Sequence, residues 1–389
     1  MIKLDFIKLI PYYQKTMEKT LCGEAIRSAL DAKGWTQKRL AEEVGVTSQS
    51  VTNWLKGVDF PRPDKLLKLA TAFQLTFDQL VNSSVQKPIV AFRKKAGTKT
   101  TDEHIVKAMA MGAMLRPLVA FLPGSPVLRS QIPAPSTDYR KMQSLVSDVR
   151  ETRIGIGMTA ELQYEHLIGQ FETNGAVIIP VLWGKKDRHK NALHIYLPAE
   201  NVTFIYLNLD THIEDFKFWM AHELAHVYTT SLTGKDEGED FADAFAGALL
   251  FPKELASSAY AEASRKGAAA ELGVLHKFAS NHKISLYTVF NQVSGYAKAE
   301  GLSPLRIRAQ DIHATRTKLH GQLISEALFS PMPPDPRSYF AAAQNIFRSA
   351  FFYALQSLLK ERGTGAGYVQ QVLDVSIKDA KAIYAELVR

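Results

Sequence analysis

The sequence predicts an α+β protein that is mostly helical, with a small sheet near the middle of the chain. Three observations support this fold class. Residues 1–85 contain short segments of helical periodicity separated by glycines. Runs rich in β-branched and aromatic residues follow one another near residues 177–183, 193–197 and 203–209. Helical periodicity then returns and continues to the end of the chain.

Length and composition restrict the class of protein. The 389 residues suggest two or three domains and are ample for a buried core. Cys22 is the only cysteine, so no intrachain disulfide can form, and we expect a reducing compartment. The N-terminal residues are interrupted by charges and lack the apolar centre of a secretory signal, and no apolar run approaches the length of a membrane span. We therefore expect a cytoplasmic protein without a membrane partner. The net charge of +8 is compatible with nucleic acid.

Residues 1–85 are predicted to form an all-α bundle of short helices. Gly45 supplies a tight turn in which a left-handed backbone costs little, and Thr36 and Thr47 are suited to cap the helices before and after it. The predicted helices are 24–33, 36–44, 48–55, one that follows Pro63, and 76–81. Two short helices joined by a glycine turn, the second opening with small polar residues, form the plan of helix-turn-helix domains.

The segment from Thr36 to Gly57 closely resembles the XRE type of phage-repressor DNA-binding domain. The resemblance implies that Gln37 lies near a backbone phosphate and that four polar side chains face the DNA groove. These four are Ser48, Gln49, Ser50 and Asn53. Gln and Asn can hydrogen-bond base edges, while neighbouring Lys and Arg can neutralise phosphates. Double-stranded operator DNA is the expected partner, and the alternative is a bundle that docks on a protein. Val51 and Trp54 are expected in the core.

Residues 86–140 are predicted to be a basic linker, a helix and a proline-rich loop. No acid interrupts the basic run until Asp102. The run consists of Lys87, Arg93, Lys94, Lys95 and Lys99. It is either a solvated tether or added grip on the DNA backbone. Helical periodicity covers residues 102–119. The irregular segment 120–140 is long enough to suggest a place next to something functional.

The central domain, predicted for residues 141–300, carries the most informative motif. A helix at 162–173 and the three strands lead into His222-Glu223-Leu224-Ala225-His226. Residues four apart share one face of a helix, so both histidines can point a ring nitrogen at one ion, and Glu223 can hold a water molecule that the ion acidifies. Glu239 is the candidate third ligand, and Asp243 is placed to orient a ligand histidine. The alternative is an ordinary helix with core or surface histidines.

A small sheet that leads into such a helix is the usual layout of zinc peptidases, in which an edge strand holds an extended substrate by backbone pairing. Tyr228 is a weaker candidate, for assisting an oxyanion. The other histidines near the sheet are interpreted as core or surface residues and not as ligands. They are His189, His194 and His212.

Residues 222–226 and 239–252 together resemble the ImmA/IrrE-type metallopeptidases. The second segment reads Glu-Asp-Phe-Ala-Asp-Ala-Phe-Ala-Gly-Ala-Leu-Leu-Phe-Pro and departs from the family pattern at Asp243, where Asn is usual. Asp at this position moves the pattern towards the gluzincin peptidases. The resemblance, which extends weakly over residues 148–302, implies a zincin-like domain that binds Zn²⁺. By the same resemblance His222, His226 and Glu239 are the zinc ligands, Glu223 is the general base, and the substrate is a repressor whose cleavage switches on silenced genes.

Residues 301–389 are predicted to form a helical C-terminal region. It contains an aromatic helix at 347–359 and a segment at 367–380 with a helix-turn-helix rhythm. Internal packing or oligomerisation, for example as a homodimer, is the expected use of this region.

The functional expectation is a DNA-binding zinc metalloprotease that cleaves a repressor or antitoxin-like protein in a stress, mobile-element or phage-defence response. One alternative is a transcriptional repressor whose peptidase-like domain only senses a partner or ligand. Another is a chain that cleaves itself, for instance in the linker near Lys94.

Overall fold

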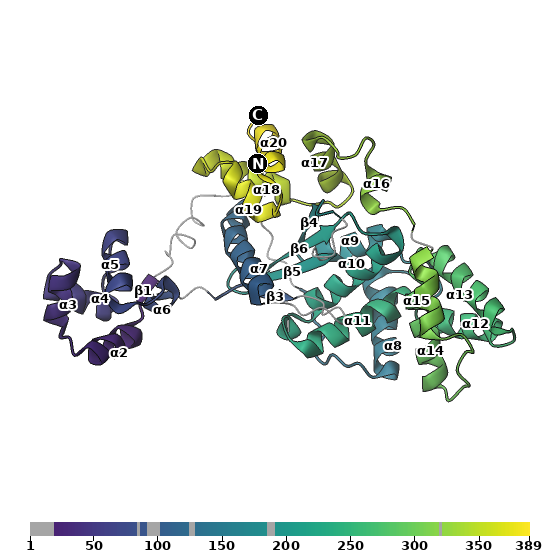
Figure 1. Ribbon diagram of the computed structural model, residues 1–389. Coiled ribbons are helices and arrows are strands. Elements are labelled where there is room, and N and C mark those ends of the chain that lie inside the picture. The colour runs from purple at the N-terminus through teal and green to yellow at the C-terminus, as the bar shows by residue number, and fades with distance from the viewer. Residues whose placement is uncertain (1–18, 84–85, 92–101, 124–128, 185–190, 319–320) are drawn as a thin grey trace, which may run out of the picture. The chain divides into compact units, whose positions relative to one another are not determined.

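The computed structural model describes residues 19–83, 86–91, 102–123, 129–184, 191–318 and 321–389. The chain divides into two compact units, Met1–Gln86 and Lys87–Arg389. Arg93, Lys94, Lys95 and Lys99 of the basic run lie outside the described residues, as does His189. Figure 1 shows a mostly helical α+β chain with a small mixed sheet in the second unit, in agreement with the predicted fold class.

The first unit is a bundle of short helices around one core. The helices are α2 (Gly23–Lys33), α3 (Gln37–Val44), α4 (Ser48–Leu55), α5 (Pro63–Phe73) and α6 (Phe77–Leu80). The Thr36 hydroxyl accepts a hydrogen bond from the backbone N–H of Arg39, and the Thr47 hydroxyl accepts one from Ser50, so both threonines cap their helices. Gly45 between them has φ 72°, in the left-handed region. Val51 and Trp54 are buried, as predicted.

A two-stranded antiparallel sheet joins the ends of this bundle, and it was not predicted. Strand β1 (Lys19–Leu21) pairs with β2 (Val81–Ser83). Each strand has three residues, which is too short for a period-two pattern to stand out in a sequence. The second strand lies in residues that resemble a loop, because Asn and Ser dominate there.

The second unit contains a four-stranded sheet in the order β3-β5-β6-β4. Strands β4 (Ala176–Val181), β5 (Ala192–Leu197) and β6 (Val202–Asn208) are the three predicted strands. Strand β4 is parallel to β6, whereas β5 is antiparallel to β6. The fourth strand, β3 (Ile89–Ala91), pairs antiparallel with β5 and lies in the segment for which a linker was predicted.

Helices pack on both faces of this sheet (Figure 1). Helices α9 (Tyr164–Thr173) and α10 (Ile213–Tyr228) pack against the strands, and α11 (Asp236–Leu250) packs along α10. The irregular segment before α8 (Tyr139–Asp148) is tied to the end of α10, since the backbone N–H of Ile132 donates to the carbonyl of Tyr228 at 2.9 Å. Part of the predicted 120–140 loop therefore lies next to the helix that carries the histidine motif.

The C-terminal helices pack on the sheet. The Tyr206 hydroxyl of β6 donates to the carbonyl of Val372 at 2.7 Å, and the Trp183 indole donates to the carbonyl of Leu373 at 2.9 Å. Buried residues from Ala108 to Leu387 belong to one hydrophobic cluster. This cluster gives the C-terminal region a packing role, and the predicted boundaries at 140 and 300 stay predictions. The other helices are α7 (Asp102–Leu115), α8 (Tyr139–Asp148), α12 (Lys253–Ala263), α13 (Ala268–His282), α14 (Leu286–Ala299), α15 (Ala309–Lys318), α16 (Ile324–Leu328), α17 (Pro336–Asn345), α18 (Phe351–Arg362), α19 (Ala366–Leu373) and α20 (Ile377–Leu387), with the short helical turns η2 (Arg116–Phe121), η3 (Val149–Ile154) and η4 (Thr230–Leu232).

One helix among the described residues, Glu103–Phe121, has the length and apolar composition of a membrane span, with a mean hydropathy of 1.3. The sequence did not lead us to expect such a helix. A core helix of a soluble protein passes the same test. Its Leu115 and Leu118 are fully buried in the main core, and a side chain at Gly112 would collide with Pro88 and with Ile195 of β5. One side of this helix therefore packs directly on the sheet.

A buried arginine joins the end of α11 to the loop before α9. Arg150 is fully buried and donates hydrogen bonds to the carbonyls of Leu249, Gly157 and Ala160. Burial lowers the pKa of its guanidinium to about 10, although Glu254 opposes this shift. We expect Arg150→Met to destabilise the protein by about 3 kcal/mol or more, because each buried acceptor left without a donor costs about 1–3 kcal/mol. Urea unfolding measures this loss. A similar loss in Arg265→Met, a change at an exposed arginine, would contradict the explanation.

Candidate metal centre and nucleic-acid interface

Helix α10 carries His222, Glu223 and His226 in its last turns, and all three are at most 4% exposed. The helix is fixed at its first half by Lys217, whose fully buried ammonium donates to the Glu161 carboxylate at 2.8 Å and to the carbonyl of His282 at 3.0 Å. Most residues in the last three turns of α10 are apolar and buried, so this helix lies inside the core and the His-Glu-x-x-His motif is buried with it.

Helix α11 brings two carboxylates to the same place. Its first turn lies against η4, and a Cβ at Gly238 would come within 2.3 Å of the carbonyl oxygen of Leu232. Only glycine allows this close approach, which sets the position of the next residue, Glu239. Asp243 lies one turn further along the same helix.

The two helices bring three potential ligands together. One ligand atom from each of His222, His226 and Glu239 lies within 4.8 Å of the other two. The Glu239 carboxylate is 3.4 Å from Nε2 of His222 and 3.3 Å from Nε2 of His226, and these two nitrogens are 3.3 Å apart. The structure thus places these three predicted residues around one point, from two separate helices.

Asp243 holds the orientation of one histidine. Nδ1 of His222 donates a hydrogen bond of 2.9 Å to the Asp243 carboxylate. This bond fixes the proton on Nδ1, so Nε2 is directed towards Glu239 and His226. Burial opposes the charge on His222, but the hydrogen bond to Asp243 and the nearby Glu239 carboxylate raise its pKa to about 9.

The burial of Glu223 changes its acid–base chemistry. Burial raises the pKa of this carboxyl to about 7, against the opposing effect of His222 and His226. Glu239 behaves differently: burial opposes its ionisation, yet the close approach of the His222 and His226 rings lowers its pKa to about 2. Two carboxyl groups next to each other are therefore suited to two roles, one as a permanent anion and the other as a group that exchanges a proton near neutral pH.

The donor set fits a divalent metal ion. Both carboxylate oxygens of Glu239 are buried and, among the described residues, lack a hydrogen-bond donor with good geometry, although they lie next to two imidazoles. Buried polar atoms without partners are rare in proteins. Two imidazole nitrogens and one carboxylate are the ligand types of a catalytic zinc site with an open position.

His194 is a neighbour of this cluster that sequence reasoning excluded as a ligand. It lies on β5, is fully buried, and its Nδ1 is 3.4 Å from the Glu223 carboxylate. Neither ring nitrogen has a hydrogen-bond partner in the part of the chain that the structure describes, and burial lowers the pKa of His194 to about 3. The only signal in the sequence was a polar residue within an otherwise apolar strand. Tyr228, the weaker candidate for assisting an oxyanion, donates its hydroxyl hydrogen bond to the Gln170 side chain at 2.7 Å.

Asp243 offers a prediction about metal affinity. We expect Asp243→Ala to lower the affinity for Zn²⁺ about 10- to 100-fold, because His222 loses the acceptor that orients it. Competition with a chromogenic chelator measures the change. Asp240→Ala, an exposed change on the same helix, is the control. An unchanged affinity in Asp243→Ala would show that His222 needs no orienting partner.

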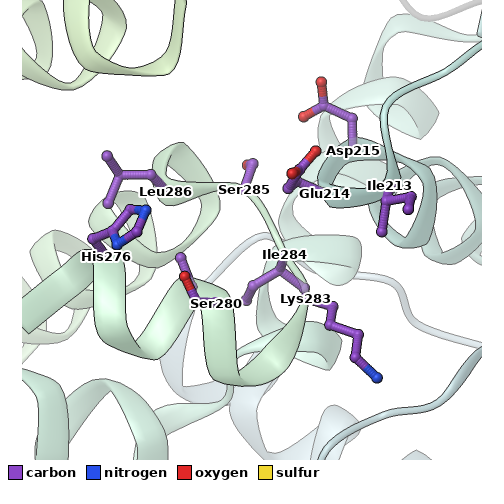
Figure 2. A pocket seen from close by; sticks show the side chains of 10 residues that line it. Ile213, Glu214, Asp215, His276, Ser280, Lys283, Ile284, Ser285 and Leu286 are labelled. Carbon is purple, nitrogen blue, oxygen red and sulfur yellow. The ribbon is translucent and has the colours of Figure 1, made fainter. Parts of the chain in front are cut away.

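Two pockets open near α10. The pocket in Figure 2 lies between the start of α10 and the turn from α13 to α14, and none of the three clustered residues lines it. Glu214 and Asp215 line its α10 side, and His276 lines the other. A second pocket is lined by Phe218 and Trp219, by Asp243 and by residues of α14. Because Asp243 binds His222, the second pocket borders the cluster.

The polar residues proposed to contact DNA lie on α3 and α4. Gln37, Ser48 and Gln49 are exposed, whereas Ser50 and Asn53 are half-buried. Gln49 donates a hydrogen bond to the Asn53 side chain at 2.9 Å, and Gln37 accepts one from Thr52 across the two helices. The Ser50 hydroxyl is 2.9 Å from that of Thr47, so this serine also contributes to the cap of α4.

Asn53 carries a prediction for DNA binding. We expect Asn53→Ala to weaken binding to a DNA site selected from a random pool by about 1–3 kcal/mol and to relax the base preference. Lys38→Ala, at an exposed residue of α3, removes only charge and is expected to weaken binding to all sequences equally. Fluorescence anisotropy with selected and scrambled duplexes separates the two effects. Equal losses on both duplexes for Asn53→Ala would refute a base contact.

The structure joins a helical bundle that contains two capped helices around a glycine turn to a domain with a buried His and Glu cluster. Comparison with known families agrees with both parts. Residues 26–80 match the helix-turn-helix family, and residues 176–286 match the IrrE N-terminal-like domain family. The chain thus joins an XRE-type helix-turn-helix domain to an ImmA/IrrE-like peptidase domain, as the sequence predicted. No curated protein and no solved structure gives a significant match.

Proposed function

We propose that the protein is a DNA-binding zinc metallopeptidase that cleaves a repressor or antitoxin-like protein and thereby derepresses genes. The observation that carries the proposal is the meeting of His222, His226 and Glu239 within 4.8 Å, with the buried Glu223 beside them. The match to the IrrE N-terminal-like family over residues 176–286 supports a peptidase reaction. The match to a DNA-binding family supports a cytoplasmic location.

His222, His226 and Glu239 would hold the ion, and bound Zn²⁺ supplies Lewis acidity that lowers the pKa of water and polarises a carbonyl. Imidazole and carboxylate ligands favour zinc and also accept other divalent ions. Glu223 takes the proton from the attacking water and passes it to the departing amine. Its pKa of about 7 suits a group that must both accept and donate at neutral pH. Asp243 keeps His222 in the tautomer that leaves Nε2 free for the ion.

The fusion of the two domains supports a substrate that also resides at DNA. A repressor bound near the operator would meet the peptidase at a raised local concentration. A homodimer would match the two-fold symmetry common in operators. These features favour a protein substrate in the same regulatory system over a general digestive role.

The second candidate is a repressor whose peptidase-like domain senses a partner or ligand without cleaving it. The matched helix-turn-helix domain favours a transcriptional role in either case. A sensor has no use for a buried base, and this chain carries a buried Glu223 whose carboxylate lies 3.4 Å from Nδ1 of His194. This residue therefore separates the two candidates.

The test is co-expression with the repressor-like product of a neighbouring gene. The peptidase proposal expects fragments of that product and induced transcription with the wild-type chain, and neither with Glu223→Gln. Undiminished induction by Glu223→Gln would favour the sensor. Intact-mass measurement of the purified chain over time detects self-cleavage, for which the proposed site near Lys94 lies outside the described residues.

A further inference from the structure

The sheet edge next to the cluster of His222, His226 and Glu239 is already paired with a strand of the same chain, β3. Strand β5 would be the outer strand on this side, and β3 pairs antiparallel along it. The pairing places Ala91 opposite His194, Val90 opposite Ile195 and Ile89 opposite Tyr196. An extended peptide that adds to a sheet edge makes the same kind of backbone ladder.

The register brings β3 to the catalytic part of the site. Side chains directly opposite each other in an antiparallel pair lie on the same face of the sheet. Ala91 therefore shares the face of His194, whose ring nitrogen is 3.4 Å from the Glu223 carboxylate and whose ring lies 5.4 Å from that of His226. Ala91 is thus paired with the residue that contacts the group proposed as the base.

Neighbouring segments fit closely around β3. Gly234, in the loop between α10 and α11, has φ 78°, and a Cβ there would lie 3.1 Å from the carbonyl oxygen of Val90. Pro88, just before the strand, touches α7 at Gly112. The carbonyl of Val90 faces the Gly234 loop, and because backbone groups alternate along a strand, those of Ile89 and Ala91 face β5.

We propose that β3 is an internal occupant of the substrate edge, so that an extended segment of the substrate must displace Ile89–Ala91 from β5 before it is cleaved. This proposal rests on the proposed peptidase function and specifies its substrate and regulation. Ala91 is 2% exposed opposite the fully buried His194. The position has room for a small side chain only. The structure therefore assigns to the substrate an extended conformation with a small residue opposite His194.

The test measures strand binding and needs no hydrolysis. The probe is a fluorescein-labelled peptide with the sequence of residues 86–91, and all proteins carry Glu223→Gln. In the released variant, Ile89→Pro with Ala91→Pro removes the N–H groups that face β5. In the locked variant, Ile89→Cys with Tyr196→Cys joins the strands by a disulfide, on a Cys22→Ser background because Cys22 is the only native cysteine. Opposite residues lie about 4.5–5.5 Å apart, within the range of a disulfide.

The proposal expects the released variant to bind the peptide at least about tenfold more tightly than the unreleased protein, and the oxidised lock to bind none until it is reduced. A matched peptide with Trp in place of the last alanine should not bind the released variant. Equal affinities for the released, unreleased and locked forms, including no binding by all three, would overturn the proposal. The lock and its reduced form have the same sequence, so they give this answer even if the proline variant does not fold. Failure of hydrolysis would leave these results unchanged, so the two proposals fail separately.

Discussion

Glu223→Gln is expected to lower peptide-bond hydrolysis by about 10²- to 10⁴-fold while the bound metal stays at the wild-type level. The side chain keeps its size but can no longer accept a proton. Glu223 is not one of the three residues that meet within 4.8 Å, so the change leaves the proposed metal ligands untouched. Single-turnover cleavage of the co-expressed substrate, with metal content measured by emission spectrometry on the same samples, gives both quantities.

Glu214→Gln is the matched control for this change. Glu214 lies in the first turn of the same helix, α10, outside the cluster. We expect its cleavage rate to stay within about twofold of wild type. A Glu223→Gln protein with a normal rate would remove the base from the mechanism, whereas loss of its metal would make Glu223 a ligand.

Glu239→Ala is expected to lower the affinity for Zn²⁺ by more than about 100-fold, because it removes one of the three proposed ligands, a larger loss than that of an orienting partner. His222 and His226 would be left 3.3 Å apart without the anion between them. Hydrolysis should fall with metal occupancy and recover partly at high zinc concentration. Titration of the metal-free protein against a chromogenic chelator measures the affinity.

Glu237→Ala provides the comparison for Glu239→Ala. Glu237 is exposed in the same first turn of α11, so its loss changes the charge by the same amount without touching the cluster. Its zinc affinity should match wild type. Normal zinc binding by Glu239→Ala would mean that another group completes the ligand set.

The elements that bring the cluster together could be predicted because their signals are local. The His-Glu-x-x-His spacing requires a helix face, and the stripe of Phe241, Ala244, Phe245 and Ala248 predicts a second helix that begins near Glu239. Thr36, Gly45 and Thr47 likewise mark helix ends through chemistry with neighbouring backbone groups. In each case the residues that determine the helix lie within a few positions of it in the sequence.

Features that depend on distant partners could not be predicted. Strand β3 exists because residues 89–91 meet β5 more than a hundred positions later, and three residues carry no periodic pattern. The position of His194 against Glu223 depends on the same tertiary arrangement. The segment 367–380, which has a helix-turn-helix pattern, contacts the sheet through Val372 and Leu373. Its local sequence does not distinguish this packing role from that of a DNA-binding helix pair.

The hydrogen bonds from Tyr206 and Trp183 to the carbonyls of Val372 and Leu373 make the C-terminal helices part of the folded peptidase-like unit. The family-matched stretch 176–286 ends long before the helices that shield its apolar strands. A protein truncated after residue 286 would expose the apolar face of the sheet around Tyr206 to water, and it would be prone to aggregation. The folding unit of this domain is therefore longer than the family-matched stretch, and it includes the C-terminal helices.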